Sequence, residues 1–315
     1  MSALHDSLTE YLATRRALGT QLRWPESSLR RFADFVETEG APFVTTDLAV
    51  RWAARSVGVQ RATIARRLGI VRGFATWLQA SDPRTQVPPQ RLFPTGPRRP
   101  LPFIYSERQI NDLLRATTVL RSGSGLRRAT FRTLVGLLAA TGLRPGEALR
   151  LDVADVDLAG GVLLVRESKF GKTRFVPVDE STRVAMAAYA GFRDEARPCR
   201  DGPAFLVTES GARVRPHAAR STFATLCRAA GLRPRRTDRR IGSGPRLQDL
   251  RHTFATRRLV SWYRAGLDTD RLMPRLATYL GHVGVESTYW YVQAVPELLA
   301  LATERLEAAA HGERR

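Results

Sequence analysis

The helical periodicity of this chain stops between residues 82 and 102, and the break divides its 315 residues into two parts. Seven prolines fall within the segment, and proline cannot donate a backbone hydrogen bond to a helix or a central strand. Such a composition is typical of an extended linker. Each flanking part is long enough for a core of its own. We therefore expect one domain at residues 1–93, a linker at residues 94–102 and a second domain at residues 103–315.

The first domain has apolar residues at helical spacing in four stretches, of which residues 62–80 form the longest. Arginines lie largely off the apolar stripe of that helix, and two more lie in the linker. A helical unit with an arginine face is suited to lie against a nucleic-acid duplex, although a solvated charged face is the common alternative. The arginines that we expect to contact DNA are Arg61, Arg66, Arg67, Arg72, Arg98 and Arg99.

The net charge of +20 and the pI of about 11.3 indicate a polyanionic partner, either nucleic acid or an acidic membrane surface. No apolar run reaches the roughly 18 residues that span a bilayer, and the polar, acid-bearing first ten residues are unlike a signal peptide. Cys199 and Cys227 have neither metal-site spacing nor disulfide density, as is usual in a reducing cytosol. We therefore expect a nucleic-acid partner, no membrane contact and a cytoplasmic location.

The second domain is predicted to be mainly α-helical with one small antiparallel β-sheet. Ser106 and Gln109 have the spacing of a capping box, and a buried helix follows at residues 131–140. Residues 162–166 and 173–178 alternate like strands and are joined by a glycine-bearing turn, which predicts a hairpin. Helices are predicted from there to residue 310.

Lysine occurs only at Lys169 and Lys172, both in the predicted hairpin, so the other 48 of the 50 basic residues are arginine. Either residue can neutralise a phosphate, but only an ammonium group can release a proton in a protein. A chain that keeps lysine at one place indicates a titratable cation there. Chance retention of a lysine on an exposed turn is the alternative.

Four separated segments carry polar residues in apolar surroundings. Arg144 lies where a helix begins, a place suited to a phosphate oxygen, and Glu147 is placed to hold its guanidinium. Gln248 and Arg251 are three residues apart, so one helix face presents both. The side chain of His252 points about 100° away from that of Arg251, which favours a packing or capping role.

The last two segments contain His282, which follows the helix-ending Gly281, and Tyr291, nine residues later. In order, the segments read Thr-Gly-Leu-Arg-x-x-Glu, a lysine hairpin, Asp-Leu-Arg-His-Thr-Phe-Ala and Leu-Gly-His-x8-Tyr. This order and spacing resemble the phage integrases, or tyrosine recombinases, and within them the transposon- or phage-borne integrases. The resemblance covers nearly all of the second domain and implies two parts, a helical core-binding domain and an α+β catalytic domain.

The resemblance implies a site-specific DNA recombinase that cuts and rejoins strands through a 3′-phosphotyrosine, without a metal or nucleotide cofactor. It implies that two arginines and a histidine bind the scissile phosphate, that a lysine protonates the leaving oxygen and that a tyrosine attacks. The chemistry is consistent, because fixed cations stabilise the charge that develops on the phosphate oxygens. The matching residues are Arg144, Arg251, His282, Lys169 and Tyr291.

Three positions leave alternatives open. Gln248 stands where the family usually has histidine, and because glutamine cannot carry a proton we expect activity to survive but to fall by ~10²-fold or less. Tyr289 competes with Tyr291 as nucleophile, and the spacing from His282 selects Tyr291. Lys172 competes with Lys169, and the family position selects Lys169.

Residues 297–309 form an amphipathic tail helix with no later segment to cover it. In the family such a tail docks on a neighbouring protomer, so we expect a homotetramer on double-stranded DNA with this helix exchanged in trans; docking in cis is the alternative.

Two other functions fit part of the pattern. A type IB topoisomerase-like enzyme shares the chemistry without strand exchange, and a non-catalytic DNA-binding regulator shares the charge.

Overall fold

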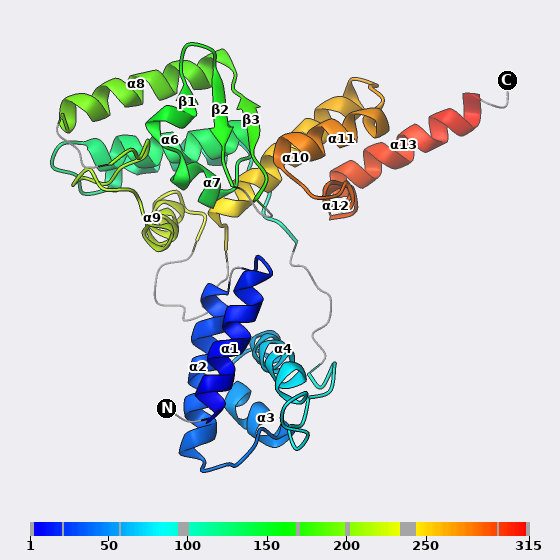
Figure 1. The fold of residues 1–315 in the computed structure, drawn as a ribbon. Helices are drawn as coiled ribbons and strands as arrows, with labels where there is room; N and C mark the ends of the chain where they lie inside the picture. Colours follow the sequence, from blue (N-terminus) through cyan, green and yellow to red (C-terminus); the bar gives the residue numbers. More distant parts are fainter. Residues whose placement is uncertain are drawn as a thin grey trace. The chain divides into compact units, whose positions relative to one another are not determined.

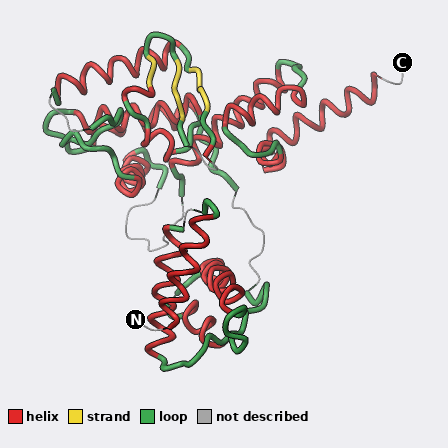
Figure 2. Tube along the Cα trace, viewed as in Figure 1, coloured by secondary structure: helices red, strands yellow, loops and turns green. Residues whose placement is uncertain are grey.

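The computed structural model describes residues 3–20, 22–56, 58–93, 101–167, 171–198, 202–233, 244–294 and 296–312. Within these ranges the chain is mostly helical with one small antiparallel sheet, so the predicted fold class is confirmed (Figures 1 and 2). The chain divides into two compact units, Met1–Arg99 and Pro100–Arg315, which are described separately. Among the predicted site residues, Arg98, Arg99 and Lys169 lie outside the described ranges.

The first unit has four helices within its described residues: α1 (Ala3–Ala17), α2 (Arg23–Thr38), α3 (Thr46–Ala54) and α4 (Arg61–Leu78). Their apolar faces enclose a core around Leu12, Phe32 and Phe74, which are almost fully buried. Burial of each such side chain contributes about 1.5–3 kcal/mol. Thr45 caps α3, since its hydroxyl accepts a hydrogen bond from the Leu48 N–H at 3.2 Å.

The second unit begins its described part with α5 (Glu107–Ala116), which has the predicted capping box of Ser106 and Gln109. The remaining described elements are the 3₁₀ turns η1 (Thr117–Val119) and η2 (Val153–Asp155), the strands β1 (Val156–Asp157), β2 (Val162–Val165) and β3 (Arg174–Pro177), and the helices α6 (Leu126–Thr141), α7 (Pro145–Arg150), α8 (Glu180–Ala196), α9 (Pro216–Ala229), α10 (Leu247–Arg264), α11 (Thr269–Leu280), α12 (Glu286–Ala294) and α13 (Pro296–Gly312).

The sheet is antiparallel with the order β1-β2-β3. Leu163 lies opposite Val176, and both are buried, whereas Phe175 on the other face is 70% exposed. This alternation follows from the two-residue repeat of a strand and attaches one face of the sheet to the core of α6 and α8. The sequence pattern predicts β2 and β3 but not the two-residue β1.

Helix α10 connects the sheet-bearing part of the unit to the part formed by α11, α12 and α13, because it packs on α6 as well as on those three helices (Figure 1). Two glycines in the left-handed conformation end the neighbouring helices, Gly142 after α6 (φ 63°) and Gly281 after α11 (φ 69°). A Cβ atom on Gly142 would lie 2.5 Å from the Phe254 ring on α10. The two helix ends therefore approach α10 closely, and their carbonyl groups become available to its side chains.

Candidate active site

Arg144 is fixed between two segments that are far apart in sequence. It is the N-cap of α7, and its backbone N–H and Nη1 both donate to the Glu147 carboxylate, at 3.0 and 2.7 Å. Its Nη2 donates to the Gly281 carbonyl at 2.9 Å. The prediction that Glu147 holds the guanidinium is confirmed.

Arg174, at the start of β3, contacts the same carboxylate as Arg144 and was not among the predicted site residues. Its Nη1 and Nη2 donate to Glu147 at 3.2 and 2.9 Å, and its Nε donates to the Tyr279 carbonyl at 2.8 Å. Burial raises the pKa of Glu147, but the hydrogen bonds from Arg174 and Arg144 outweigh it and lower that pKa to about 2. Glu147 therefore stays ionised at neutral pH and lies between the guanidinium groups of Arg144 and Arg174. Only the position of Arg174 in the lysine hairpin, two residues after Lys172, could have drawn attention to it.

Arg251, on α10, is 2% exposed and is held by carbonyl groups at the two glycine-terminated helix ends. Its Nη1 donates to Gly142 at 2.9 Å and its Nη2 donates to Leu280 at 2.6 Å. Burial and the nearby Arg144 lower its pKa to about 10, so it remains charged at neutral pH. No carboxylate in the described ranges forms an ion pair with it. A buried cation that forms no ion pair with a carboxylate of the described residues has the charge and hydrogen-bond donors that suit a phosphate oxygen.

His282 follows Gly281 as predicted, and its ring is oriented from α12. Its Nδ1 is hydrogen-bonded to the Thr288 hydroxyl at 2.7 Å, and Thr288 is fully buried. The His282 ring is nearly parallel to the Tyr291 ring, with their centroids 6.4 Å apart. The structure therefore brings these two residues together.

Tyr291 lies on α12 and is 1% exposed, with its ring packed between histidines of two segments. It is close enough to Arg251 to act on that cation electrostatically. Tyr289 is 39% exposed, and its hydroxyl donates to Asp270 at 3.0 Å. Of the two tyrosines, the structure places Tyr291 beside His282 and Arg251. The polar cluster, as it is called below, consists of Arg144, Glu147, Arg174, Arg251, His282 and Tyr291.

His252 makes one contact beyond those that were predicted. The sequence analysis assigned it to packing or capping, and its ring does contact the Trp290 ring at a centroid distance of 5.8 Å. However, its Nδ1 is also hydrogen-bonded to the Tyr291 hydroxyl at 3.0 Å. The assignment was incomplete because α12 covers the side of α10 that faces away from the arginines, so both sides of α10 contribute to the cluster.

The remaining predicted residues are less closely engaged. Gln248 is half-buried on α10, one turn before Arg251, and its side chain has no hydrogen-bond partner among the described residues. Lys169 cannot be placed, because it lies outside the described residues. Lys172 is exposed at the edge of the hairpin.

The four described arginines of the first unit that were predicted to contact DNA fall into two pairs. Arg61 and Arg66 are exposed on α4. Arg67 donates to the Ala53 carbonyl at 2.9 Å, and Arg72 donates to the Pro88 carbonyl at 2.7 Å. The second pair therefore also attaches α4 to neighbouring backbone.

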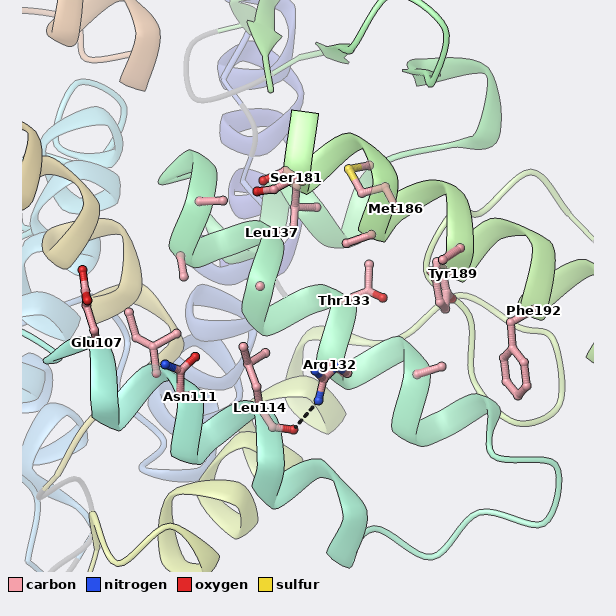
Figure 3. Close-up of a pocket in the computed structure, with 18 of the residues that line it drawn as sticks. Glu107, Asn111, Leu114, Arg132, Thr133, Leu137, Ser181, Met186, Tyr189 and Phe192 are labelled. Carbon is pink, nitrogen blue, oxygen red and sulfur yellow. Dashed lines mark hydrogen bonds between the residues drawn. The ribbon is translucent and has the colours of Figure 1, made fainter. Parts of the chain in front are cut away.

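Other kinds of site are not evident in the described residues. None of them form a group of three or more His, Cys, Asp or Glu side chains that could hold a metal ion, and none of the described helices is long and apolar enough to cross a membrane. An apolar groove of about 720 Å³ lies between α5, α6 and α8 (Figure 3). Its lining includes Leu114, Leu137 and Met186 but no member of the polar cluster, so it is a separate feature.

Comparisons with known proteins support the resemblance seen in the sequence. Residues 105–297, more than half of the chain, match the family model described as "Phage integrase family". A putative integrase/recombinase, y4rB of Sinorhizobium fredii (strain NBRC 101917 / NGR234), is 43% identical over 98% of both chains. The tyrosine recombinase XerC of Mycobacterium sp. (strain JLS) is 31% identical and covers 92% of this chain and 94% of its own.

Solved structures share the fold at low sequence identity. The Tn1549 transposon integrase in complex with transposon right end DNA has a TM-score of 0.66 and 17% identity, covering 96% of this chain and 99% of that chain. The XerH site-specific recombinase bound to a palindromic difH substrate has a TM-score of 0.61 and 17% identity, covering 91% and 78%. The family match, the curated relatives and the shared fold lead to one conclusion: this chain belongs to the phage integrase family, the tyrosine recombinases, and is a site-specific DNA recombinase.

Proposed function

We propose that this chain cleaves and rejoins DNA through a covalent 3′-phosphotyrosine at Tyr291. The observation that carries the proposal is the convergence of Tyr291, His282, Arg251 and Arg144, which come from three helices and the loop after Gly281. A phenol beside an unpaired buried cation is suited to attack a phosphodiester, because the cation stabilises the negative charge that develops on the phosphate oxygens.

In the proposed step, Arg144, Arg251 and His282 bind the non-bridging oxygens. The Tyr291 oxygen forms a bond to phosphorus while the bond from phosphorus to the 5′-oxygen breaks, and the leaving oxygen takes a proton from Lys169. The ester keeps the energy of the broken bond, so the 5′-hydroxyl of a partner strand can reverse the reaction without a nucleotide or a metal. Gln248 can add one neutral hydrogen bond to the phosphate.

Double-stranded DNA is the proposed substrate. The net charge of +20 favours it, as do the exposed Arg61 and Arg66 and the DNA-bound state of the Tn1549 and XerH structures that share the fold. Affinity then falls steeply as salt rises, since each neutralised phosphate releases counterions. A cytoplasmic location is part of the same proposal.

The proposed assembly is a homotetramer on DNA in which part of α13 is exchanged in trans. In the single chain the start of α13 docks in cis, because Leu298 is fully buried among α10 and α12 residues and Glu297 pairs with Arg264 at 2.8 Å. The exchanged part is therefore the part beyond Thr303. Truncation after Glu304 keeps the cis contacts and is expected to abolish pairing of two DNA sites while leaving single-site binding. Unchanged pairing would refute the exchange.

A covalent-adduct assay tests the proposed chemistry. The protein is incubated with nicked duplexes selected from a random pool for binding, and products are separated on a denaturing gel. We expect an adduct with the wild type and with Tyr289→Phe but not with Tyr291→Phe. A non-catalytic regulator would give no adduct on any bound duplex. A topoisomerase-like enzyme would give the adduct and relax supercoils but form no recombinants between two sites.

A further inference from the structure

His252 directly contacts the atom that the proposed function makes the nucleophile. Its Nδ1 lies 3.0 Å from the Tyr291 hydroxyl oxygen, and both residues are buried, at 7% and 1% exposure. Trp290 packs against the edge of the imidazole ring, so the ring is held in this orientation. In the tautomer with the proton on Nε2, Nδ1 accepts the Tyr291 O–H.

A proton acceptor at this position has a clear chemical use. A tyrosine hydroxyl has an ordinary pKa near 10, so at neutral pH it is a weak nucleophile until its proton is removed. An imidazole that is neutral at pH 7 is well matched to that task. Gln248 has no basic atom, and the Nδ1 of His282 is already bonded to Thr288.

The charged groups around this contact favour transfer of the proton. Arg251, Arg144 and Arg174 are fixed cations on one side, partly balanced by Glu147. Arg251 is close enough to Tyr291 for attraction between this cation and a phenoxide to favour loss of the phenol proton. On the other side of the tyrosine ring lies His282, and α12 contributes the neutral Trp290. The proton that leaves Tyr291 therefore has the His252 Nδ1 within hydrogen-bond distance, at 3.0 Å.

We propose that His252 is the general base for Tyr291, an inference that rests on the proposed function. As the tyrosine oxygen bonds to phosphorus, its proton passes to Nδ1 of His252 and leaves an imidazolium, while Lys169 protonates the departing 5′-oxygen. In the rejoining step the imidazolium returns the proton to the tyrosine oxygen, and the lysine removes the proton of the attacking 5′-hydroxyl. The proton acceptor thus comes from position 252, next to Arg251, and not from position 248.

Deprotonation of the nucleophile and protonation of the leaving group can be tested separately with a substrate in which sulfur replaces the bridging 5′-oxygen. A thiolate leaves without a proton, so only deprotonation of the nucleophile is still needed. We expect His252→Asn to slow adduct formation by about 10²-fold on both the oxygen and the sulfur substrate. Asparagine is chosen because its amide can occupy the place of Nδ1 without being basic. Lys169→Arg is expected to be slow on the oxygen substrate and rescued by sulfur.

The pH–rate profile on the sulfur substrate distinguishes a general base from a residue that only maintains the structure, because loss of a structural contact leaves the shape of the profile unchanged. The wild-type rate is expected to level off above the pKa of the base, whereas the His252→Asn rate is expected to rise about tenfold per pH unit because hydroxide replaces the base. His217→Asn, which changes an exposed histidine on α9, is the matched control and keeps wild-type behaviour. DNA binding measured on the same preparations verifies folding.

Three results overturn the assignment. One is a wild-type rate in His252→Asn, and another is a slow variant whose pH profile parallels that of the wild type, which shows positioning alone. The third is rescue of His252→Asn by sulfur, which places His252 on the leaving-group side. Failure of the proposed function looks different, because then the wild type itself forms no adduct on either substrate.

Discussion

The carboxylate of Glu147 offers the most direct test of how the cluster is held together. It is 3% exposed and accepts four hydrogen bonds, two from Arg144 and two from Arg174. The substitution Glu147→Gln keeps the shape of the side chain but removes its charge. It also turns an N–H group toward a guanidinium, so two partly buried cations lose their shared anion.

The size of the effect follows from the pKa of Glu147, which is lowered from 4.5 to about 2 by Arg174 and Arg144 against the opposing effect of burial. A shift of that size corresponds to about 3 kcal/mol of folding free energy at neutral pH. Because the pKa is lowered in the folded state, this stabilisation is complete above pH 4.5 and is lost as the pH falls toward 2. Breaking a buried ion pair costs a similar 3–5 kcal/mol or so.

Hydrogen exchange of peptides from α7 and α10 against urea measures the stability of this unit alone. At pH 7 we expect Glu147→Gln to lose about 3 kcal/mol, and we expect the difference from wild type to shrink below pH 4.5. Glu180→Gln, which breaks an exposed pair with Arg183, is the control and keeps the wild-type urea midpoint. Equal stabilities of Glu147→Gln and wild type at pH 7, or a difference that stays constant with pH, would refute this explanation.

Three further substitutions test other parts of the site. Gly142→Ala forces a side chain onto a residue with φ of 63° and against the Phe254 ring, so we expect a loss of about 1–3 kcal/mol in the same exchange measurement; wild-type stability would contradict it. Arg174→Met removes one partner of the buried carboxylate, and we expect adduct formation to fall far more than DNA affinity measured by fluorescence anisotropy; a parallel fall in both would contradict a role in the site. Lys169→Arg is expected to slow adduct formation on ordinary DNA by about 10²–10⁴-fold while Lys172→Arg does not, and the reverse order would reassign the acid.

Features set by local chemistry could be predicted from the sequence. The capping box at Ser106, the glycine that ends α11 at Gly281 and the hairpin strands all depend on residues close together in the chain. The observed strands, Val162–Val165 and Arg174–Pro177, end within one residue of the predicted limits. Gly281 places His282 just after α11, and Arg144 stands where α7 begins, which is why both could be recognised from their motifs.

Long-range contacts could not be predicted in the same way. The ion pair of Arg174 with Glu147 depends on how the sheet packs beside α7, and no spacing in the sequence encodes that. The packing role predicted for His252 is present in its contact with Trp290, but its hydrogen bond to Tyr291 depends on α12, and the 100° spacing along α10 could not reveal it. In the folded chain, Arg251 faces the ends of α6 and α11 while His252 faces α12, so the site surrounds α10.

The burial of Tyr291 has a consequence for the timing of the proposed cleavage. A hydroxyl on a side chain that is 1% exposed cannot meet a phosphate until the packing around α12 opens. Cleavage then includes an opening step before the chemical step, and the slower of the two sets the observed rate. A stronger base or a better leaving group accelerates cleavage only up to the rate of opening. Changes in the packing of α12 against α10 and α13 therefore set the upper limit of the cleavage rate without touching the phosphate.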